Sequence, residues 1–213
     1  TEGINVSQQA TGYLFTPGLY TEDQVEAWKR VTNAVHAEGG RIFAQLWHVG
    51  RLSHVSIQPN NQAPVSSVAE AVVTSHAYAW VEPGKPGRVK ASTPRALGTD
   101  EVQRVTADFV KAGLRAIEAG FDGVELHGAH GFLIQNFFSP WFNQRTDEWG
   151  GSLANRMRFP LEVVREVRRV IETHARKPFL LRYRGFVNGM VASHLLCHSG
   201  TINRHSLNGA LLS

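Results

Sequence analysis

Phe121-Asp-Gly-Val-Glu-Leu126, followed directly by His127-Gly-Ala-His130, is the stretch of sequence that decides the fold. Its first six residues are mostly apolar and predict a short buried strand. A helical pattern precedes this strand, with Thr99 as its expected cap and Gly120 as its end. The apolar side of that helix is formed by Val102, Val105, Phe109, Val110, Leu114 and Ile117. A helix that leads into a buried strand indicates one unit of a parallel sheet.

The same order of helix and strand occurs twice more. Thr21-Glu-Asp-Gln24 has the form of a capping box, and the helix behind it stops at two glycines before the apolar segment Ile42–Trp47. A third helix is predicted from about Ser152 to Thr173, and Pro160 either bends it or starts its main segment. The strand that follows is Pro178–Tyr183. Three such units in succession predict a parallel βα architecture.

Two architectures compete for these units, a doubly wound open sheet and a (β/α)8 barrel. No Gly-x-Gly-x-x-Gly follows a predicted strand, which disfavours the nucleotide-binding open sheet. Polar side chains gather where strands end: Gln45, Trp47 and His48 on the first, His127 on the next, and Arg182 and Arg184 on the third. A complete barrel takes about 250 residues, so we predict an α/β fold that is an incomplete TIM barrel with about strands 2 to 5 present.

An insertion is expected near residues 55–95. The stretch between His48 and Gly98 is too long for an ordinary βα loop, and turn signals surround the alternating segment Ser75–Val81. We therefore expect a hairpin that folds near the mouth of the barrel.

The two ends of the chain carry separate expectations. The first residue is Thr1 rather than methionine, and we expect a fragment that lacks its N-terminal segment. The barrel is expected to cover residues 1–184, with residues 185–213 as an atypical tail. No acidic residue follows Glu172, and no helix or strand period continues beyond about Met190. A disordered tail and a segment that is out of frame are both open explanations.

Composition excludes several classes of protein. The formal charge is +4, and Lys and Arg are scattered rather than clustered, so we expect no nucleic-acid partner. No stretch approaches the roughly 20 apolar residues that span a bilayer, so no membrane partner is expected. The single cysteine, Cys197, fits a reducing compartment, and we expect a cytoplasmic protein. Nothing in the sequence indicates an oligomeric state, which stays unknown.

His127 and His130 are the strongest candidates for chemistry, because their spacing lets both side chains converge where a strand ends. Two imidazole donors suit an oxygen that gains negative charge, such as an enolate. A His-x-x-His pair can also bind zinc, which normally takes a third protein ligand. We expect Glu125 to point to the opposite face of the strand and to be a poor third ligand. Anion recognition, metal binding and a purely structural pair all remain open at this point.

Two further polar residues and an aromatic group lie near the same strand ends. Gln45 either makes a core hydrogen bond or recognises the edge of a flat heterocycle, since a buried unpaired amide costs about 1–3 kcal/mol. Arg182 either pairs with a carboxylate or faces an electron-rich ring. Most of the aromatic side chains are expected to be core, although some suit the wall of a planar pocket. They are Trp47, Phe132, Phe137, Phe138, Trp141 and Phe142.

Two long motifs carry a family resemblance. Glu125-Leu-His-Gly-Ala-His-Gly-Phe-Leu-Ile-Gln-Asn-Phe137 and Asn143-Gln-Arg-Thr-Asp-Glu-Trp-Gly-Gly-Ser-Leu-Ala-Asn-Arg156 closely resemble the old yellow enzyme family. Gln45-Leu-Trp-His-Val-Gly-Arg51 and Ser92-Thr-Pro-Arg-Ala-Leu97 resemble its N-ethylmaleimide reductase and 12-oxophytodienoate reductase branch. The resemblance covers about residues 1 to 184, in order and with ordinary spacing.

The resemblance implies a barrel that binds FMN without a covalent link and uses NADPH or NADH as reductant. Hydride would pass from flavin N5 to a small-molecule activated alkene, an α,β-unsaturated carbonyl or nitro compound. By position, His127 and His130 match the pair that holds the substrate oxygen, and His127 also matches a flavin contact. The other matches are Gly3 to a backbone flavin contact, Gln45 to the flavin pyrimidine edge, Arg182 to flavin N1, and Trp47 to the substrate pocket. No metal is implied.

The sequence departs from the family at one catalytic position. The tyrosine that donates a proton to the substrate is expected two residues after the second histidine, and Phe132 stands there. Family members also extend at both ends, with flavin contacts on the first strand and phosphate-binding loops on the last. Three hypotheses follow: an FMN-dependent ene-reductase, a catalytically silent barrel fragment that does not retain FMN, and a metal-dependent barrel hydrolase that uses both histidines as ligands.

Overall fold

The computed structural model describes residues 1–72, 74–187 and 190–198, and from residue 186 onward the backbone alone. Its main sheet contains, in spatial order, β1 (Gly3–Asn5), β2 (Phe43–Trp47), β7 (Gly123–His127), β8 (Leu180–Val187) and β9 (Met190–His198). The first four strands are parallel, and β9 is antiparallel to β8. The helices α1 (Glu22–Ala37), α2 (Thr99–Glu118) and α4 (Leu153–His174) each precede a strand, which confirms the three predicted units.

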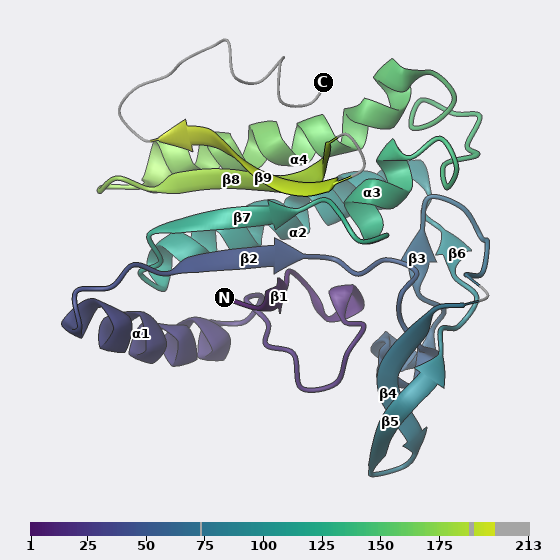
Figure 1. Ribbon diagram of the computed structural model, residues 1–213, viewed down its shortest axis with the longest axis horizontal. Helices are drawn as coiled ribbons and strands as arrows, with labels where there is room; N and C mark the ends of the chain where they lie inside the picture. Colours follow the sequence, from purple (N-terminus) through teal and green to yellow (C-terminus); the bar gives the residue numbers. More distant parts are fainter. Residues whose placement is uncertain (73, 188–189, 199–213) are drawn as a thin grey trace.

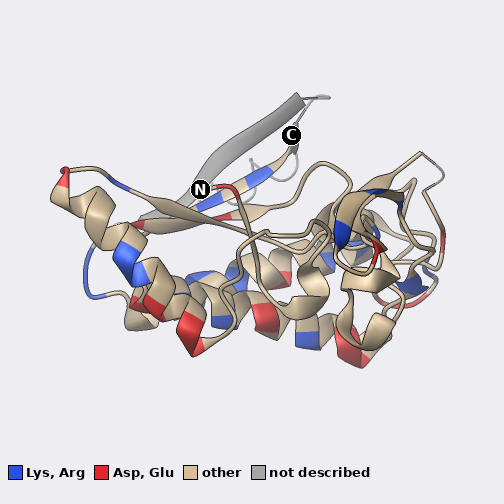
Figure 2. Cartoon of the chain, turned by 90° about the horizontal axis from the view of Figure 1, so that it is seen from below, with Lys and Arg blue, Asp and Glu red and all other residues tan. Residues whose placement is uncertain are grey.

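All three long helices lie on one face of the sheet (Figures 1 and 2). A doubly wound sheet carries helices on both faces, whereas a barrel carries them only outside. Within the described part of the chain, the arrangement therefore matches an open section of barrel. Figure 2 also shows that basic and acidic residues both occur along the helices.

The helix ends follow largely from local sequence. The α1 capping box is confirmed: the Gln24 amide N–H donates to the Thr21 hydroxyl (3.3 Å), and the Thr21 N–H donates to the Gln24 side chain (3.1 Å). For α2, the predicted cap is off by one residue. Gly98 occupies the cap, its N–H donates to the Glu101 carboxylate (2.9 Å), and Thr99 is the first helical residue. Gly120 then ends the segment with φ +83°.

Helix α4 begins after Ser152, whose hydroxyl accepts from the Asn155 N–H. Pro160 lies inside this continuous helix and is buried, so it does not start a separate segment. The short helix α3 (Leu133–Phe138) follows β7 and packs against α4.

The core fills the space between the sheet and the helices. Ala44, Leu46, Val124, Leu126 and Leu181 point from the strands into this layer and are fully buried. They meet the apolar sides of α2 and α4, to which Val105, Phe109, Val163 and Val167 belong. Burial along β2 alternates, with Phe43, Gln45 and Trp47 only half-buried. One face of β2 therefore packs on the helices, and the other looks into the open side of the sheet.

The insertion is confirmed as a hairpin. Strands β4 (His76–Glu82) and β5 (Lys85–Lys90) pair antiparallel around Gly84, whose φ is +77°. A second small ladder joins β3 (Val65–Ser66) and β6 (Arg95–Ala96). Short 3-10 turns occupy Gln8–Ala10, Val55–Ile57 and Pro59–Asn61. A bridge between Tyr13 and Tyr78 connects the hairpin to the N-terminal segment (Figure 1).

The region after residue 184 differs from expectation where it is described. Strand β8 continues to Val187, and β9 follows it as its antiparallel partner, although the sequence predicted no strand beyond about Met190. The antiparallel β9 also departs from the all-parallel order of a barrel. The proposed origins of the tail stay predictions, and residues 199–213 lie outside the described residues.

Candidate functional site

The polar residues at the strand ends form a row across the sheet. Gly3 of β1 lies opposite Gln45 of β2, Gln45 opposite Glu125 of β7, and Glu125 opposite Arg182 of β8. Because side chains alternate along a strand, this row faces away from the helices. Gln45, His127 and Arg182 thus lie on the neighbouring strands β2, β7 and β8, with His127 two residues beyond the row.

Glu125 links two members of the row. The Gln45 amide Nε2 donates to Glu125 Oε1 at 2.8 Å, and Arg182 Nε lies 3.8 Å from Glu125 Oε2. Glu125 is only 9% exposed. The prediction that Glu125 points to the face opposite His127 is wrong, since residues two apart on a strand share a face. The spacing of two residues between Glu125 and His127 was the sequence signal that could have placed Glu125 on this face.

His127 and His130 come together at the end of β7, with ring centroids 5.0 Å apart. The Ala129 N–H donates to His127 Nδ1 at 3.3 Å, which leaves the proton of a neutral ring on Nε2. His130 has φ +58°, the left-handed region that non-glycine residues rarely adopt. This turn brings the second imidazole back toward the first. His127 is 3% exposed, whereas His130 is exposed.

The electrostatic surroundings keep this pair neutral. Burial, and then the charges of His130 and Arg184, lower the pKa of His127 to about 4. Burial and Arg184 also lower the pKa of His130. At neutral pH both rings are therefore uncharged, and each can offer an N–H to an oxygen atom.

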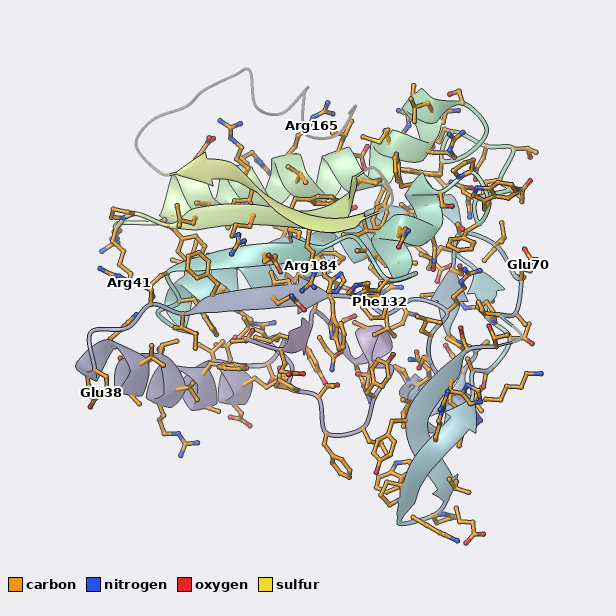
Figure 3. The ribbon with its side chains drawn as sticks, viewed as in Figure 1. Glu38, Arg41, Glu70, Phe132, Arg165 and Arg184 are labelled. Carbon is orange, nitrogen blue, oxygen red and sulfur yellow. The ribbon has the colours of Figure 1, made fainter. Side chains whose placement is uncertain are left out.

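Aromatic rings surround His127. The Phe132 ring lies 4.8 Å from it and the Trp47 ring 6.2 Å, and the two aromatic rings meet edge to face at 5.0 Å. The indole N–H of Trp47 donates to Asn5 Oδ1 (2.8 Å), which fixes its plane. A Cβ on Gly3 would lie 2.4 Å from that indole, so only glycine fits there. These contacts place two apolar rings in fixed positions beside the histidine pair; Phe132 is labelled in Figure 3.

Not every aromatic side chain near the strand ends contributes. Phe137 is fully buried in the core as expected, but Trp141 is 85% exposed and belongs to neither core nor pocket. Phe142 instead stacks under the Arg51 guanidinium, 3.9 Å from its ring centroid. Phe132 is 5% exposed and precedes α3, and its ring has no acidic proton to donate.

Arg184 is a residue that the sequence places at the end of the third strand without giving it a role. It lies opposite His127 in the register of β7 and β8, and its carbonyl accepts from the Gly128 N–H at 2.7 Å. The Tyr183 hydroxyl fills the space where a Gly128 side chain would be, so this glycine is required for the close approach. The turn from His127 to His130 is thereby anchored to β8.

A metal site is not supported by this geometry. Among the residues that the structure describes, no group of three or more His, Cys, Asp or Glu side chains is placed to hold a metal ion.

No helix in the described part of the chain is long and apolar enough to cross a membrane.

The parallel strands with their helices on one face define a class, the β/α barrel proteins, and comparison with known proteins identifies the family. The family model described as NADH:flavin oxidoreductase / NADH oxidase matches residues 1–192. The chain belongs to this family of oxidoreductases. The match extends past the predicted boundary at residue 184.

The similar proteins are reductases of the same family. The chain is 47% identical to 12-oxophytodienoate reductase 1 of Oryza sativa subsp. japonica over 173 residues, which are 81% of this chain and 43% of that protein. It is 45% identical to 12-oxophytodienoate reductase 2 of Arabidopsis thaliana over 170 residues, 80% of this chain and 44% of that protein. The chain therefore spans less than half the length of these relatives.

Solved structures show the same correspondence. Morphinone reductase in complex with tetrahydroNAD superimposes with a TM-score of 0.81 at 44% identity, over 90% of this chain and 52% of that one. An old yellow enzyme homologue from Zymomonas mobilis gives 0.75 at 36% identity, over 85% and 48%. These neighbours are TIM barrels of the old yellow enzyme type, and this chain corresponds to about half of one.

Proposed function

We propose that the chain is part of an FMN-dependent NAD(P)H oxidoreductase that reduces activated alkenes, namely α,β-unsaturated carbonyl or nitro compounds. The observation that carries this proposal is the neutral His127–His130 pair at the end of β7, directly beside the row that holds Gln45 and Arg182. A flat cofactor over the row would leave the histidine pair facing the substrate oxygen.

The residues of the row fit the pyrimidine side of a flavin. Gly3 presents backbone with no side chain, and Arg182 presents a guanidinium that is 43% exposed. Gln45 gives its Nε2 to Glu125, so its Oε1 is the atom that accepts from a cofactor N–H. Glu125 thus fixes which way the amide faces. Bound FMN would supply a hydride at N5 after reduction by NADPH or NADH.

His127 and His130 would act on the substrate. Each donates an N–H to the carbonyl or nitro oxygen, and these bonds strengthen as that oxygen gains charge. Donors that are fixed before the reaction need no rearrangement, and the bond from Ala129 to His127 provides such fixation. Trp47 and Phe132 would provide the apolar surface against which the alkene lies.

The proton that completes the reduction has to come from another source than residue 132. Phe132 occupies the position beside both imidazoles, 4.8 and 6.2 Å away between ring centroids, and offers only carbon atoms. We propose that water delivers the proton to the α-carbon. Hydride transfer does not depend on this step, although turnover does.

The names of similar proteins agree with this chemistry. Relatives are 12-oxophytodienoate reductases, and a structural neighbour binds a reduced nicotinamide analogue. We carry both the alkene substrate and the nicotinamide reductant to this chain as proposals. Cytoplasmic location and the absence of nucleic-acid and membrane partners stay predictions from composition.

The proposal is tested by loading the purified chain with FMN and following NADPH or NADH oxidation with and without 2-cyclohexenone. Alkene-dependent oxidation, with cyclohexanone as product, is the expected result. A folded chain that takes up no FMN would establish the silent fragment instead, and a flavin-loaded chain without alkene-dependent oxidation would contradict the proposal. Stoichiometric zinc in a chain without flavin would favour the hydrolase.

A further inference from the structure

Arg184 is a cation that the proposed reaction does not use. It belongs to the next row along the open face, two residues after Arg182, and lies opposite His127. Tyr183 between them is buried on the helix side, which places both arginines on the face of the histidine pair. Figure 3 shows Arg184 toward the same end of the sheet as Phe132.

The two arginines differ in how their charge is balanced. Arg182 lies 3.8 Å from the Glu125 carboxylate, whereas no carboxylate is within ion-pair distance of Arg184 among the side chains that the structure describes. The remaining sequence does not change this, because no Asp or Glu follows Glu172. The open face therefore carries one balanced row and, directly beside the imidazoles, one row with an excess positive charge.

Arg184 lowers the pKa of both imidazoles. For His127, its charge is the third contribution, after burial and the charge of His130. For His130, it is the second contribution, after burial. A guanidinium close enough to disfavour a positive imidazole will favour a negative ligand at the same place.

We propose that Arg184, directly beside the oxygen-binding pair His127 and His130, forms an anion subsite that selects ligands and alkenes carrying a carboxylate on a flat apolar body. The planar guanidinium suits a carboxylate, which it can bind with two parallel hydrogen bonds. The edge-to-face rings of Trp47 and Phe132 provide the surface for the apolar part. This inference adds a substrate class to the proposed function. The carboxylate-bearing alkene rests on that function, whereas anion binding itself needs no flavin.

The test measures dissociation constants of the whole chain by calorimetry for 4-hydroxybenzoate and for its uncharged methyl ester, without FMN and with it. The acid is expected to bind more tightly than the ester, and added salt should weaken only the acid. Arg184→Met is expected to weaken acid binding about tenfold, as for loss of a charged hydrogen bond, and to leave the ester within about twofold. Inorganic phosphate is the third probe, and it should bind more weakly than 4-hydroxybenzoate.

The matched control is Arg165→Met. Arg165 is an exposed residue of α4 (Figure 3), so this variant removes the same charge from the side of the sheet that carries the helices. It should leave both constants unchanged. Arg184→Lys keeps the charge and should retain most of the preference, which covers the case in which Arg184→Met does not fold.

Equal affinity of the unmodified chain for acid and ester would overturn the subsite, as would equal losses from Arg184→Met and Arg165→Met. Phosphate binding tighter than that of the acid would overturn the assignment to carboxylates. Failure of the chain to take up FMN would count against the proposed function alone, because the acid preference is measured without flavin.

Discussion

His127 acts as a neutral donor because of where single atoms lie around it. Its Nδ1 is occupied by the Ala129 N–H, so Nε2 carries the proton, and burial keeps the ring uncharged with a pKa of about 4. A charged imidazole would hold an anion more strongly before the reaction, whereas a neutral donor gains most as charge develops.

His127→Ala is therefore expected to weaken the binding of a phenol such as 4-hydroxybenzaldehyde to the flavin-loaded chain. Loss of one hydrogen bond to an anionic oxygen should raise the dissociation constant about tenfold and weaken the charge-transfer absorption band. Absorbance titration provides both values. His174→Ala, an exposed histidine at the end of α4, is the control, and unchanged binding in His127→Ala would refute the role.

Phe132→Tyr should restore a proton donor beside the imidazoles. If protonation limits turnover, alkene reduction is expected to rise by about one to two orders of magnitude, the usual range of an acid catalyst being 10²–10⁴. Stopped-flow measurement separates flavin reoxidation by the alkene from steady-state turnover. Phe15→Tyr, at an exposed position, controls for the added hydroxyl. An unchanged rate would show that protonation is not limiting.

The sequence predicted the residues whose signal is local and missed those defined by pairing across strands. His127, Gln45 and Arg182 were found because each ends an apolar run. Glu125 was assigned to the wrong face, although its spacing of two residues from His127 indicates a shared face. Arg184 was placed at a strand end without a role, because its position opposite His127 depends on the register of β7 and β8. The register depends on how neighbouring strands pair in the folded sheet, so the sequence of a single strand does not reveal it.

Helices show how far local rules extend at the scale of elements. The α1 box follows directly from Thr21 and Gln24, whereas α2 has Gly98 at the cap that the sequence assigned to Thr99. Glu101 explains the shift: it pairs with Arg95 (2.6 Å) and accepts from the Gly98 N–H. The contact to Arg95 of β6 is a tertiary interaction, which a pattern within the helix does not contain.

Thr21→Ala is expected to lower the free energy of unfolding by about 1 kcal/mol, because one N–H of the first turn loses its acceptor. Urea denaturation followed by circular dichroism measures the change. Thr173→Ala is the matched control: its hydroxyl bonds back to the Arg169 carbonyl within α4, and alanine should be neutral there or slightly stabilising. Equal losses in both variants would contradict the importance of the cap.

The described part of the chain is a section of barrel with its three long helices on one face of the sheet (Figure 1). Its core lies on that side, and the candidate site lies on the open side. Helix–strand periodicity predicted this arrangement. The antiparallel β9 was not predicted, because residues 190–198 lack the regular alternation of apolar and polar side chains that is typical of a strand.

Acid should destabilise the molecule through its buried histidines. Burial, and then the charge of Arg104, lower the pKa of His48 to about 3, and that of His127 is about 4, against 6.5 for an ordinary histidine. Below pH 6.5 the unfolded chain binds protons that the folded chain excludes. Stability is thus complete above pH 6.5 and is lost as pH falls toward 4 and 3.

His48→Gln should flatten this dependence by about 1.4 kcal/mol per pH unit between pH 6 and 4, since one excluded proton is removed. Urea unfolding at several pH values measures the slope. His174→Gln, at an exposed position, should leave it unchanged. A slope that is the same in His48→Gln and the unmodified chain would show that this imidazole is protonated in the folded state.

Titration of the flavin-free chain with FMN tests the central claim most directly. The row of Gly3, Gln45 and Arg182 predicts saturable quenching of flavin fluorescence at one FMN per chain. Arg182→Met should weaken that binding, and Arg165→Met should not. Flavin that stays fully fluorescent with the folded, unmodified chain would contradict the claim that this row holds the cofactor.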